Sequence, residues 1–147
     1  MTTTTTAAKE WWVIGHKIER IDTSGEYDAL VGETPAGVPG PPPHYHATFS
    51  ELFMVLKGQM EFLVDGRKVL LNEGESIDLP PGTVHTFSNP TNSSIRWLNV
   101  HSPKGFQAFF QRFGIPATEE GAFQSSVAQT VIEQVIREAK SYDMIIV

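Results

Sequence analysis

Two short stretches of the chain carry three of its five histidines and constrain the fold more than any other feature. The first contains His44 and His46 and, after an interval of four residues, Glu51. The second contains Pro80-Pro81-Gly82, followed by His85. Three imidazoles and one carboxylate form a complete ligand set for a divalent transition metal. The chain is therefore expected to adopt a fold that brings two distant segments together.

The segment from Trp11 to about His101 consists of short apolar runs that Gly, Pro, Asn and Asp interrupt. Asp65-Gly66 has the composition of a type I′ hairpin turn. The segment from Gly32 to Pro43 is rich in Gly and Pro and is predicted to be a non-helical loop. Many short strands bounded by turn residues predict a closed barrel or a sandwich. We expect strands at residues 11–14, 27–31, 51–57, 59–64, 68–71, 76–79, 84–88 and 95–101.

The pattern changes at Ser102, after which helical periodicity begins. Ser102-Pro103 has the form of an N-cap followed by proline at the first helical position, and Gly114 stands where a glycine would end that helix. A second helix is expected to start at Ser126, with Gln129 completing a capping box. Apolar residues recur at helical spacing in both segments: Phe106, Phe109, Phe110 and Phe113 in the first, and Val127, Val131, Val135 and Ala139 in the second.

These patterns divide the chain into three parts. Residues 1–10, with the polar run Thr2–Thr6, are expected to form a disordered arm. Residues 11–102 are expected to form the barrel, and residues 103–147 a helical extension that packs on the barrel or on a partner. A homodimer is favoured, because exposed strand edges and large apolar faces are usually covered.

Composition excludes several classes of function. The formal net charge is −6, from 17 acidic and 11 basic residues, and an acidic surface argues against a nucleic-acid partner because it repels phosphate groups. There are no cysteines, so disulfides and thiolate metal sites are excluded. The longest purely apolar stretch, Leu52 to Leu56, is far too short to cross a membrane. We therefore expect a soluble, cytoplasmic protein whose partner is a small-molecule substrate.

The two histidine stretches resemble the two signature motifs of the cupin family. The first motif matches from His44 through His46 and Glu51 to Gly58, although Gly37 and Gly40 straddle the expected position of its leading glycine. The second motif matches at every position, which are Gly74, Pro80, Gly82, His85 and Asn89. The short interval between the motifs resembles small single-domain bacterial cupins. The proline-rich segment before His44 and the phenylalanine-rich helix resemble, more loosely, the quercetin-dioxygenase-like cupins.

This resemblance implies a fold, a metal and a ligand set. The fold would be mainly β, a double-stranded β-helix or jelly-roll barrel with C-terminal α-helices. His44, His46, Glu51 and His85 would hold one divalent transition-metal ion. Fe, Mn, Ni, Co, Cu and Zn all suit three neutral imidazoles and one carboxylate. Asn89 is expected to brace a turn rather than to bind the metal.

Strand alternation predicts which side chains accompany the ligands into the barrel. Phe53 and Val55 share the parity of Glu51, and Phe87 shares that of His85. These three residues are predicted to line a substrate pocket, the alternative being that they simply fill the barrel.

Other side chains have less certain directions. The Phe106–Phe113 face either seals an end of the barrel or an interface, or lines the pocket as a lid. The directions of Trp97 and Asn99 stay open, because the register of their strand does not follow from the sequence. His101 is interpreted as a cap or rim residue, the alternative being that it reaches the pocket, and His16 is interpreted as a surface or edge-strand residue.

Three functions are consistent with such a site. The first is a metal-dependent, dioxygenase-like oxidoreductase that acts on a small aromatic or enol-type substrate bound to the metal, with Glu51 as catalytic base. The second is a redox-independent isomerase, lyase or cyclase that uses the ion as a Lewis acid. The third is a non-catalytic module that binds a small molecule. The intact ligand set favours the first.

Overall fold

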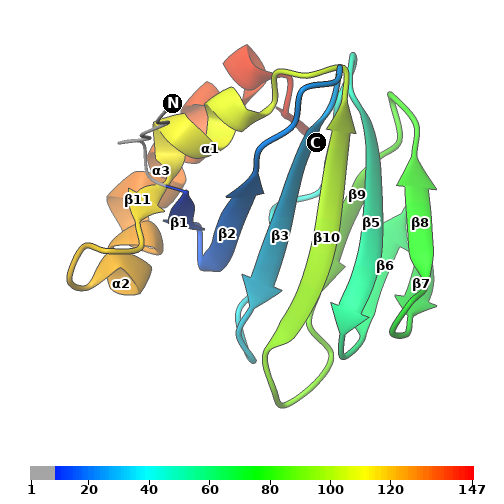
Figure 1. Ribbon diagram of the computed structural model, residues 1–147, viewed down its shortest axis with the longest axis horizontal. Helices are drawn as coiled ribbons and strands as arrows, with labels where there is room; N and C mark the ends of the chain where they lie inside the picture. The colour runs from blue at the N-terminus through cyan, green and yellow to red at the C-terminus, as the bar shows by residue number, and fades with distance from the viewer. Residues whose placement is uncertain (1–8) are drawn as a thin grey trace, which may run out of the picture.

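The computed structural model describes residues 9–147 and consists of two antiparallel sheets with helices at one end (Figure 1). The larger sheet has the strand order β11 (Ile115–Pro116), β1 (Glu10–Val13), β2 (His16–Ile21), β3 (Asp28–Thr34), β10 (Ile95–Ser102), β5 (Ser50–Lys57) and β8 (Ser76–Leu79). The smaller sheet has the order β12 (Ile145–Ile146), β4 (His44–Tyr45), β9 (His85–Ser88), β6 (Met60–Val64) and β7 (Arg67–Leu71). The predicted mainly-β, jelly-roll fold class is confirmed.

The two sheets pack face to face around one hydrophobic core. The ring of Phe53 on β5 lies 5.1 Å from that of Phe62 on β6 and 5.5 Å from that of Phe87 on β9, centroid to centroid. Aromatic side chains of both sheets therefore meet in the interior, as the inner faces of a sandwich do.

Strand β10 settles the register that the sequence left open. Its burial alternates, so that Trp97, Asn99 and His101 all face the interior. Trp97 lies so close to β3 that a Cβ atom added at Gly32 would stand 2.3 Å from its ring. A glycine at position 32 is therefore required for the indole to pack.

The predicted strands are all present, and one strand longer than two residues was missed. Asp65 and Gly66 have φ angles of 47° and 83°, which confirms the predicted type I′ turn. Strand β3 continues to Thr34, so the predicted loop begins three residues later than Gly32 suggested. The missed strand, β2, pairs with both β1 and β3, and its charged outward residues hid its alternation.

Three helices and a 3₁₀ turn follow the barrel: α1 (Gln107–Phe113), α2 (Ala122–Ser126), α3 (Gln129–Glu138) and the turn at Ala139–Tyr142. The helices gather beside β1 and β11 (Figure 1). No helix in residues 9–147 is long and apolar enough to cross a membrane. Of the predicted disordered arm, residues 1–8 lie outside the described residues, while Glu10 begins β1.

The predicted start of α1 at Ser102-Pro103 is wrong. Strand β10 runs through Ser102, which pairs with Ser50, and the helix begins at Gln107. The carboxylate of Asp28 on β3 accepts hydrogen bonds from the amides of Gly105 (2.8 Å) and Gln107 (3.3 Å). A distant side chain therefore satisfies the free amides at the helix start, which no local motif could indicate.

Gly114 does end α1, because its amide donates to the carbonyl of Phe110. Its φ of −73° is not left-handed. A Cβ at this position would stand 2.7 Å from Trp11, so close packing explains this glycine.

The predicted helix start at Ser126 is also wrong. Ser126 is the last residue of α2, and α3 starts at Gln129 without a side-chain cap. The Ser126 hydroxyl donates to the carbonyl of Phe123 (2.7 Å) and accepts from the amide of Gly15 (3.1 Å). Ser126 thus ties α2 to the turn between β1 and β2 instead of capping the next helix.

Candidate metal centre

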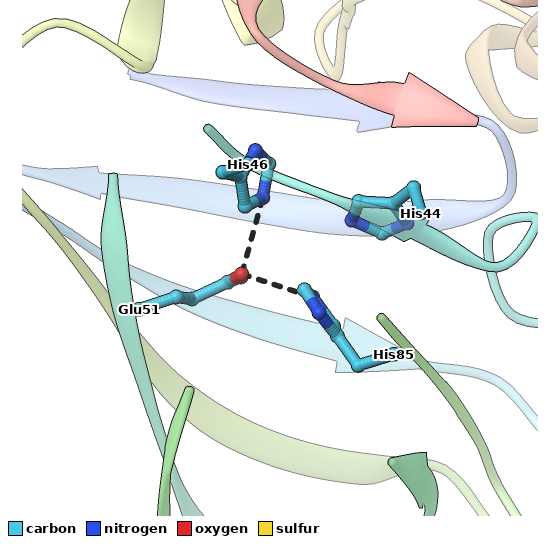
Figure 2. A group of neighbouring side chains, drawn as sticks. All are labelled: His44, His46, Glu51 and His85. Atoms are coloured by element: carbon cyan, nitrogen blue, oxygen red, sulfur yellow. Dashed lines mark ion pairs between the residues drawn. The ribbon is translucent and has the colours of Figure 1, made fainter. Parts of the chain in front are cut away.

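The four predicted ligands meet at one buried point between the two sheets. His44 on β4 stands directly opposite His85 on β9, and His46 follows β4 by one residue. Glu51 comes from β5 in the other sheet, and Figure 2 shows it pointing between His46 and His85. The candidate ligand atoms of the four residues lie within 4.8 Å of one another. None of the four residues is more than 5% exposed.

The segment between His46 and Glu51 bends at Ala47 and Thr48. The carboxylate of Asp143 accepts hydrogen bonds from the amides of Ala47 (2.9 Å) and Thr48 (2.8 Å). The carbonyl of His46 accepts one from the amide of Gly82 (2.8 Å), in the turn that precedes β9. The bend is thereby fixed from both sides, and His46 and Glu51 face each other across the gap between the sheets.

Hydrogen bonds on the outer side of each ring set the tautomer of the three histidines. The Nδ1 atoms lie 2.8, 2.7 and 2.9 Å from the carbonyl oxygens of Pro42, Asp143 and Thr83, for His44, His46 and His85 in turn. A carbonyl oxygen can only accept, so each Nδ1 must carry a hydrogen. In the neutral rings the Nε2 atoms are therefore free of hydrogen, as in histidines that bind a metal.

The carboxylate of Glu51 stands among atoms that are themselves acceptors. Its Oε2 lies 3.2 Å from Nε2 of His46 and 3.1 Å from Nε2 of His85 (Figure 2). Within residues 9–147, Oε2 of Glu51 and Nε2 of His85 have no hydrogen-bond partner. One proton on His85 would relieve one of these contacts. A divalent cation, in contrast, could be bound by the carboxylate oxygen and all the imidazole nitrogens at once. The residues present therefore fit a bound metal ion.

Two further residues hold the other oxygen of the same carboxylate. The Asn99 amide donates to Oε1 of Glu51 over 3.1 Å, and Nε2 of His101 lies 3.2 Å from it. His101 is only 2% exposed and stacks on Phe106 with a centroid distance of 4.4 Å. The interpretation of His101 as a cap or rim residue is wrong, because the pairing of His101 with Glu51 turns its side chain inward.

The charges of the cluster shift its pKa values in opposite directions. Burial, and then the neighbouring His85, lower the pKa of His44 to about 4. Burial tends to raise the pKa of Glu51, but His101, His46 and His85 outweigh it and bring that pKa well below its usual range. Burial tends to lower the pKa of His85, but Glu51 raises it overall. The cluster thus holds an ionised carboxylate beside imidazoles, which suits a cation site.

A cavity of about 70 Å³ adjoins the four ligands. Phe53 and Phe87 are in its wall, whereas Val55 is buried in the core and does not line it. In the phenylalanine-rich segment, Phe106, Phe109 and Phe110 line the cavity, whereas Phe113 packs in the core without lining it. The remaining wall is mainly apolar and includes Val13, Ile18, Trp97, Phe106, Phe109, Phe110 and Met144.

His16 also lines this cavity, so its interpretation as a surface or edge-strand residue is wrong. Strand β2 lies between β1 and β3, and His16 is 4% exposed. Its Nδ1 lies 2.9 Å from the hydroxyl oxygen of Thr34, which also accepts a hydrogen bond from the Trp97 indole over 3.0 Å. The sequence offered one signal, because His16 shares strand parity with Ile18, a core residue.

We expect His16 to make the stability of the metal-free protein sensitive to acid. Burial lowers the pKa of His16 from 6.5 to about 4, and the Pro39 carbonyl is the smaller, opposing influence. Unfolding therefore takes up a proton between these values, so the free energy of unfolding falls as the pH falls through this window. Between pH 7 and pH 4.5, the His16→Phe variant should lose about 2 kcal/mol less than wild type in urea denaturation. Identical pH dependence in the two proteins would contradict this.

Fold and site together define a small antiparallel barrel with a buried His₃Glu cluster. Comparison with known proteins supports this description. A family model for the cupin domain matches residues 31–101. Quercetin 2,3-dioxygenase of Bacillus subtilis (strain 168) is 31% identical over 107 residues, which cover 69% of this chain and 31% of that protein. An uncharacterised protein of Aquifex aeolicus (strain VF5) is 41% identical over 61 residues, covering 42% of this chain and 50% of the relative.

Among solved structures, KdgF from Halomonas sp. superposes with a TM-score of 0.60 at 19% identity, over 67% of this chain and 89% of that chain. This likeness concerns the fold alone. The chain thus carries a cupin domain and has the cupin fold. It spans between about a third and a half of the length of the two curated relatives.

Proposed function

We propose that the protein is a metal-dependent oxidoreductase of the dioxygenase kind that acts on a small aromatic or enol-type substrate. One observation carries this proposal: three hydrogen-free imidazole nitrogens and an ionised carboxylate converge at a buried point that opens into an apolar cavity. The 31% identity to a quercetin 2,3-dioxygenase supports the reaction class.

The four candidate ligands would hold one divalent ion, either Fe, Mn, Ni, Co, Cu or Zn; they are His44, His46, Glu51 and His85. Such an ion, when bound, supplies Lewis acidity and, if redox-active, the means to exchange electrons with dioxygen. Four protein ligands leave positions open on an octahedral ion, so the oxygens of a substrate fit beside them. The outer carbonyl contacts of the three imidazoles keep the rings oriented for this task.

Glu51 is suited to act as the base that removes a proton from a substrate hydroxyl. Its pKa lies well below the usual range, so it is ionised at neutral pH but can take a proton only from a hydroxyl whose own pKa a bound metal ion would lower. The amide of Asn99 donates to Oε1 and holds the carboxylate toward the cavity. A carboxylate within reach of a bound hydroxyl can accept its proton directly.

The cavity restricts the size and polarity of the substrate. Its volume of about 70 Å³ is room for roughly five water molecules, far below the 300–1,000 Å³ of sites for drug-sized ligands. A single ring or a short enol fits this space better than a flavonol does. The phenylalanines of the wall exclude water from the reacting atoms.

Metal analysis followed by oxygen-uptake assays tests this proposal. Protein purified without metal-affinity resin should contain one transition-metal ion per chain. Protein reloaded with Fe, Mn or Ni should consume oxygen with catechols or diketones, and the reaction should stop under nitrogen. Turnover that persists under nitrogen and with zinc would instead indicate the isomerase, lyase or cyclase class. Absence of bound metal and of turnover with every metal and substrate would overturn the proposal.

A further inference from the structure

His16 is the polar group of the cavity wall that stands apart from the metal cluster. The other polar residues of the wall are the four candidate ligands and the two residues that contact Glu51, namely Asn99 and His101. His16 sits among Val13, Ile18 and Phe87, and its ring lies 5.4 Å from that of Phe87. A buried histidine in such a wall needs a reason beyond packing.

The strand register places His16 and Glu51 toward opposite ends of the cavity. Strand β3 begins at Asp28, which pairs with His101, and His101 in turn pairs with Glu51. The same strand ends at Thr34, whose hydroxyl contacts His16. The cavity therefore extends from the metal cluster at one end of β3 toward His16 at the other.

The hydrogen bonds around Thr34 determine which nitrogen of His16 carries the hydrogen. The Thr34 hydroxyl oxygen accepts from the Trp97 indole, and its own hydrogen needs an acceptor because Thr34 is fully buried. Nδ1 of His16, at 2.9 Å, is the acceptor in reach. If Nδ1 carried the hydrogen instead, the hydroxyl hydrogen would be left without a partner. The arrangement that satisfies Thr34 and Trp97 places the hydrogen of His16 on Nε2.

That Nε2–H group is a buried donor without a hydrogen bond. Among the residues that the structure describes, Nε2 of His16 has no hydrogen-bond partner. The Pro39 carbonyl lies near enough to act on the ring as an acceptor and to raise its pKa slightly, but it does not meet the geometry of a full hydrogen bond to Nε2. Buried donors are nearly always paired, and an unpaired one at the wall of a cavity points to a ligand that pairs with it.

We propose that Nε2–H of His16 recognises the substrate by donating a hydrogen bond to an uncharged oxygen at the end remote from the metal cluster. This inference rests on the proposed function, because it takes the metal cluster as the site for the other end of the substrate. The substrate class is then a single-ring or enol compound with chelating oxygens at one end and a carbonyl, ether or hydroxyl oxygen at the other. A carboxylate at the remote end is disfavoured, because the surrounding wall is apolar and His16 is neutral.

Two matched probes test the inference on Co²⁺-loaded protein under nitrogen: catechol, and 3,4-dihydroxybenzaldehyde, which adds a carbonyl on the far side of the ring. Dissociation constants come from the change in the visible Co²⁺ spectrum. In wild type the aldehyde should bind about 10-fold tighter than catechol, which is the effect of one added hydrogen bond. The His16→Phe variant should lose this ratio. His16→Gln should restore most of it, because the amide oxygen accepts from Thr34 while the amide nitrogen donates into the cavity.

The controls separate this inference from the proposed function. The Lys17→Gln variant, altered at the outward-facing neighbour on β2, should keep the wild-type ratio. If catechol binds and the aldehyde gains nothing in wild type, the role of His16 is overturned while the metal site stands. If neither probe perturbs the Co²⁺ spectrum, the proposed function fails and this inference fails with it. Nitrogen-15 NMR of the histidines gives an independent reading, since a hydrogen on Nδ1 of His16 would also overturn the assignment.

Discussion

The Glu51→Gln variant is expected to lose the rise in melting temperature that a divalent metal ion produces in the wild-type protein. Glu51 is the one anionic residue among the four candidate ligands, and glutamine keeps its shape while removing its charge. Metal at about 1,000 times its dissociation constant adds about 4 kcal/mol to the free energy of unfolding. In a chain of this length that corresponds to roughly 10 °C. Calorimetry with and without Co²⁺ measures the difference.

The same substitution should change the melting temperature of the metal-free protein much less. There the Glu51 carboxylate faces Nε2 of His46 and His85 at 3.2 and 3.1 Å. A glutamine amide can donate to one of these nitrogens, which offsets part of the loss of the ionised carboxylate that His101, His46 and His85 favour. The metal-free variant should therefore melt close to the temperature of metal-free wild type. A variant that simply misfolds would lower both melting temperatures.

Glu61→Gln is the matched control, because it makes the same chemical change on β6, where the side chain points out of the barrel beside Lys68. It should keep the full metal-dependent rise in melting temperature. A Glu51→Gln variant that also keeps the full rise would show that the carboxylate does not bind the metal.

The ligands could be predicted from the sequence because their chemistry is local to each motif. An imidazole pair on one strand and a carboxylate just beyond it have few structural uses besides metal binding, and a third imidazole after a Pro-Gly turn completes the set. The strands around them were predicted wherever apolar residues alternate. Strand β2 was missed because Lys17 and Glu19 dominate its appearance, although both lie on its outer face.

The residues around Glu51 could not be predicted, because strand pairing alone decides their direction. Trp97, Asn99 and His101 necessarily share one face of β10, but the sequence does not say which. Residues directly opposite each other in an antiparallel pair share a face. His101 stands opposite Glu51 and Asn99 opposite Phe53, so the partner strand turns the whole set inward. The same holds for His16, whose neighbours on β3 explain its burial.

The C-terminal segment has a role at the site that no local motif revealed. Strand β12 pairs with β4, placing Ile146 opposite His44, and the amide of Val147 donates to the carbonyl of Pro43. Met144 lines the cavity. These contacts lie outside residues 31–101, which the cupin family model matches. The extension that follows the barrel therefore supports β4, which carries His44 and is followed directly by His46.

Asp143 is the residue through which this segment is expected to control metal affinity. Its carbonyl accepts a hydrogen bond from Nδ1 of His46 over 2.7 Å, and its carboxylate holds the amides of Ala47 and Thr48. Removing the carboxylate frees the bend after His46 and lets the imidazole move away from the other ligands. Loss of such an outer contact typically reduces metal affinity 10- to 100-fold. We expect a reduction of about this size in Asp143→Ala, measured by calorimetric titration with Co²⁺.

Two further substitutions separate the carboxylate from the backbone at this position. Asp143 has a left-handed φ of 61°, which costs alanine about 1–2 kcal/mol but suits glycine and asparagine. Asp143→Gly should therefore fold without that strain and still bind Co²⁺ 10- to 100-fold more weakly. Asp143→Asn, which keeps one acceptor oxygen, should bind Co²⁺ with an affinity between those of Asp143→Gly and wild type.

The exposed Asp78 on β8 offers a control, since Asp78→Ala should bind Co²⁺ with the same affinity as wild type. Wild-type Co²⁺ affinity in Asp143→Gly would show that the Asp143 carboxylate does not position His46.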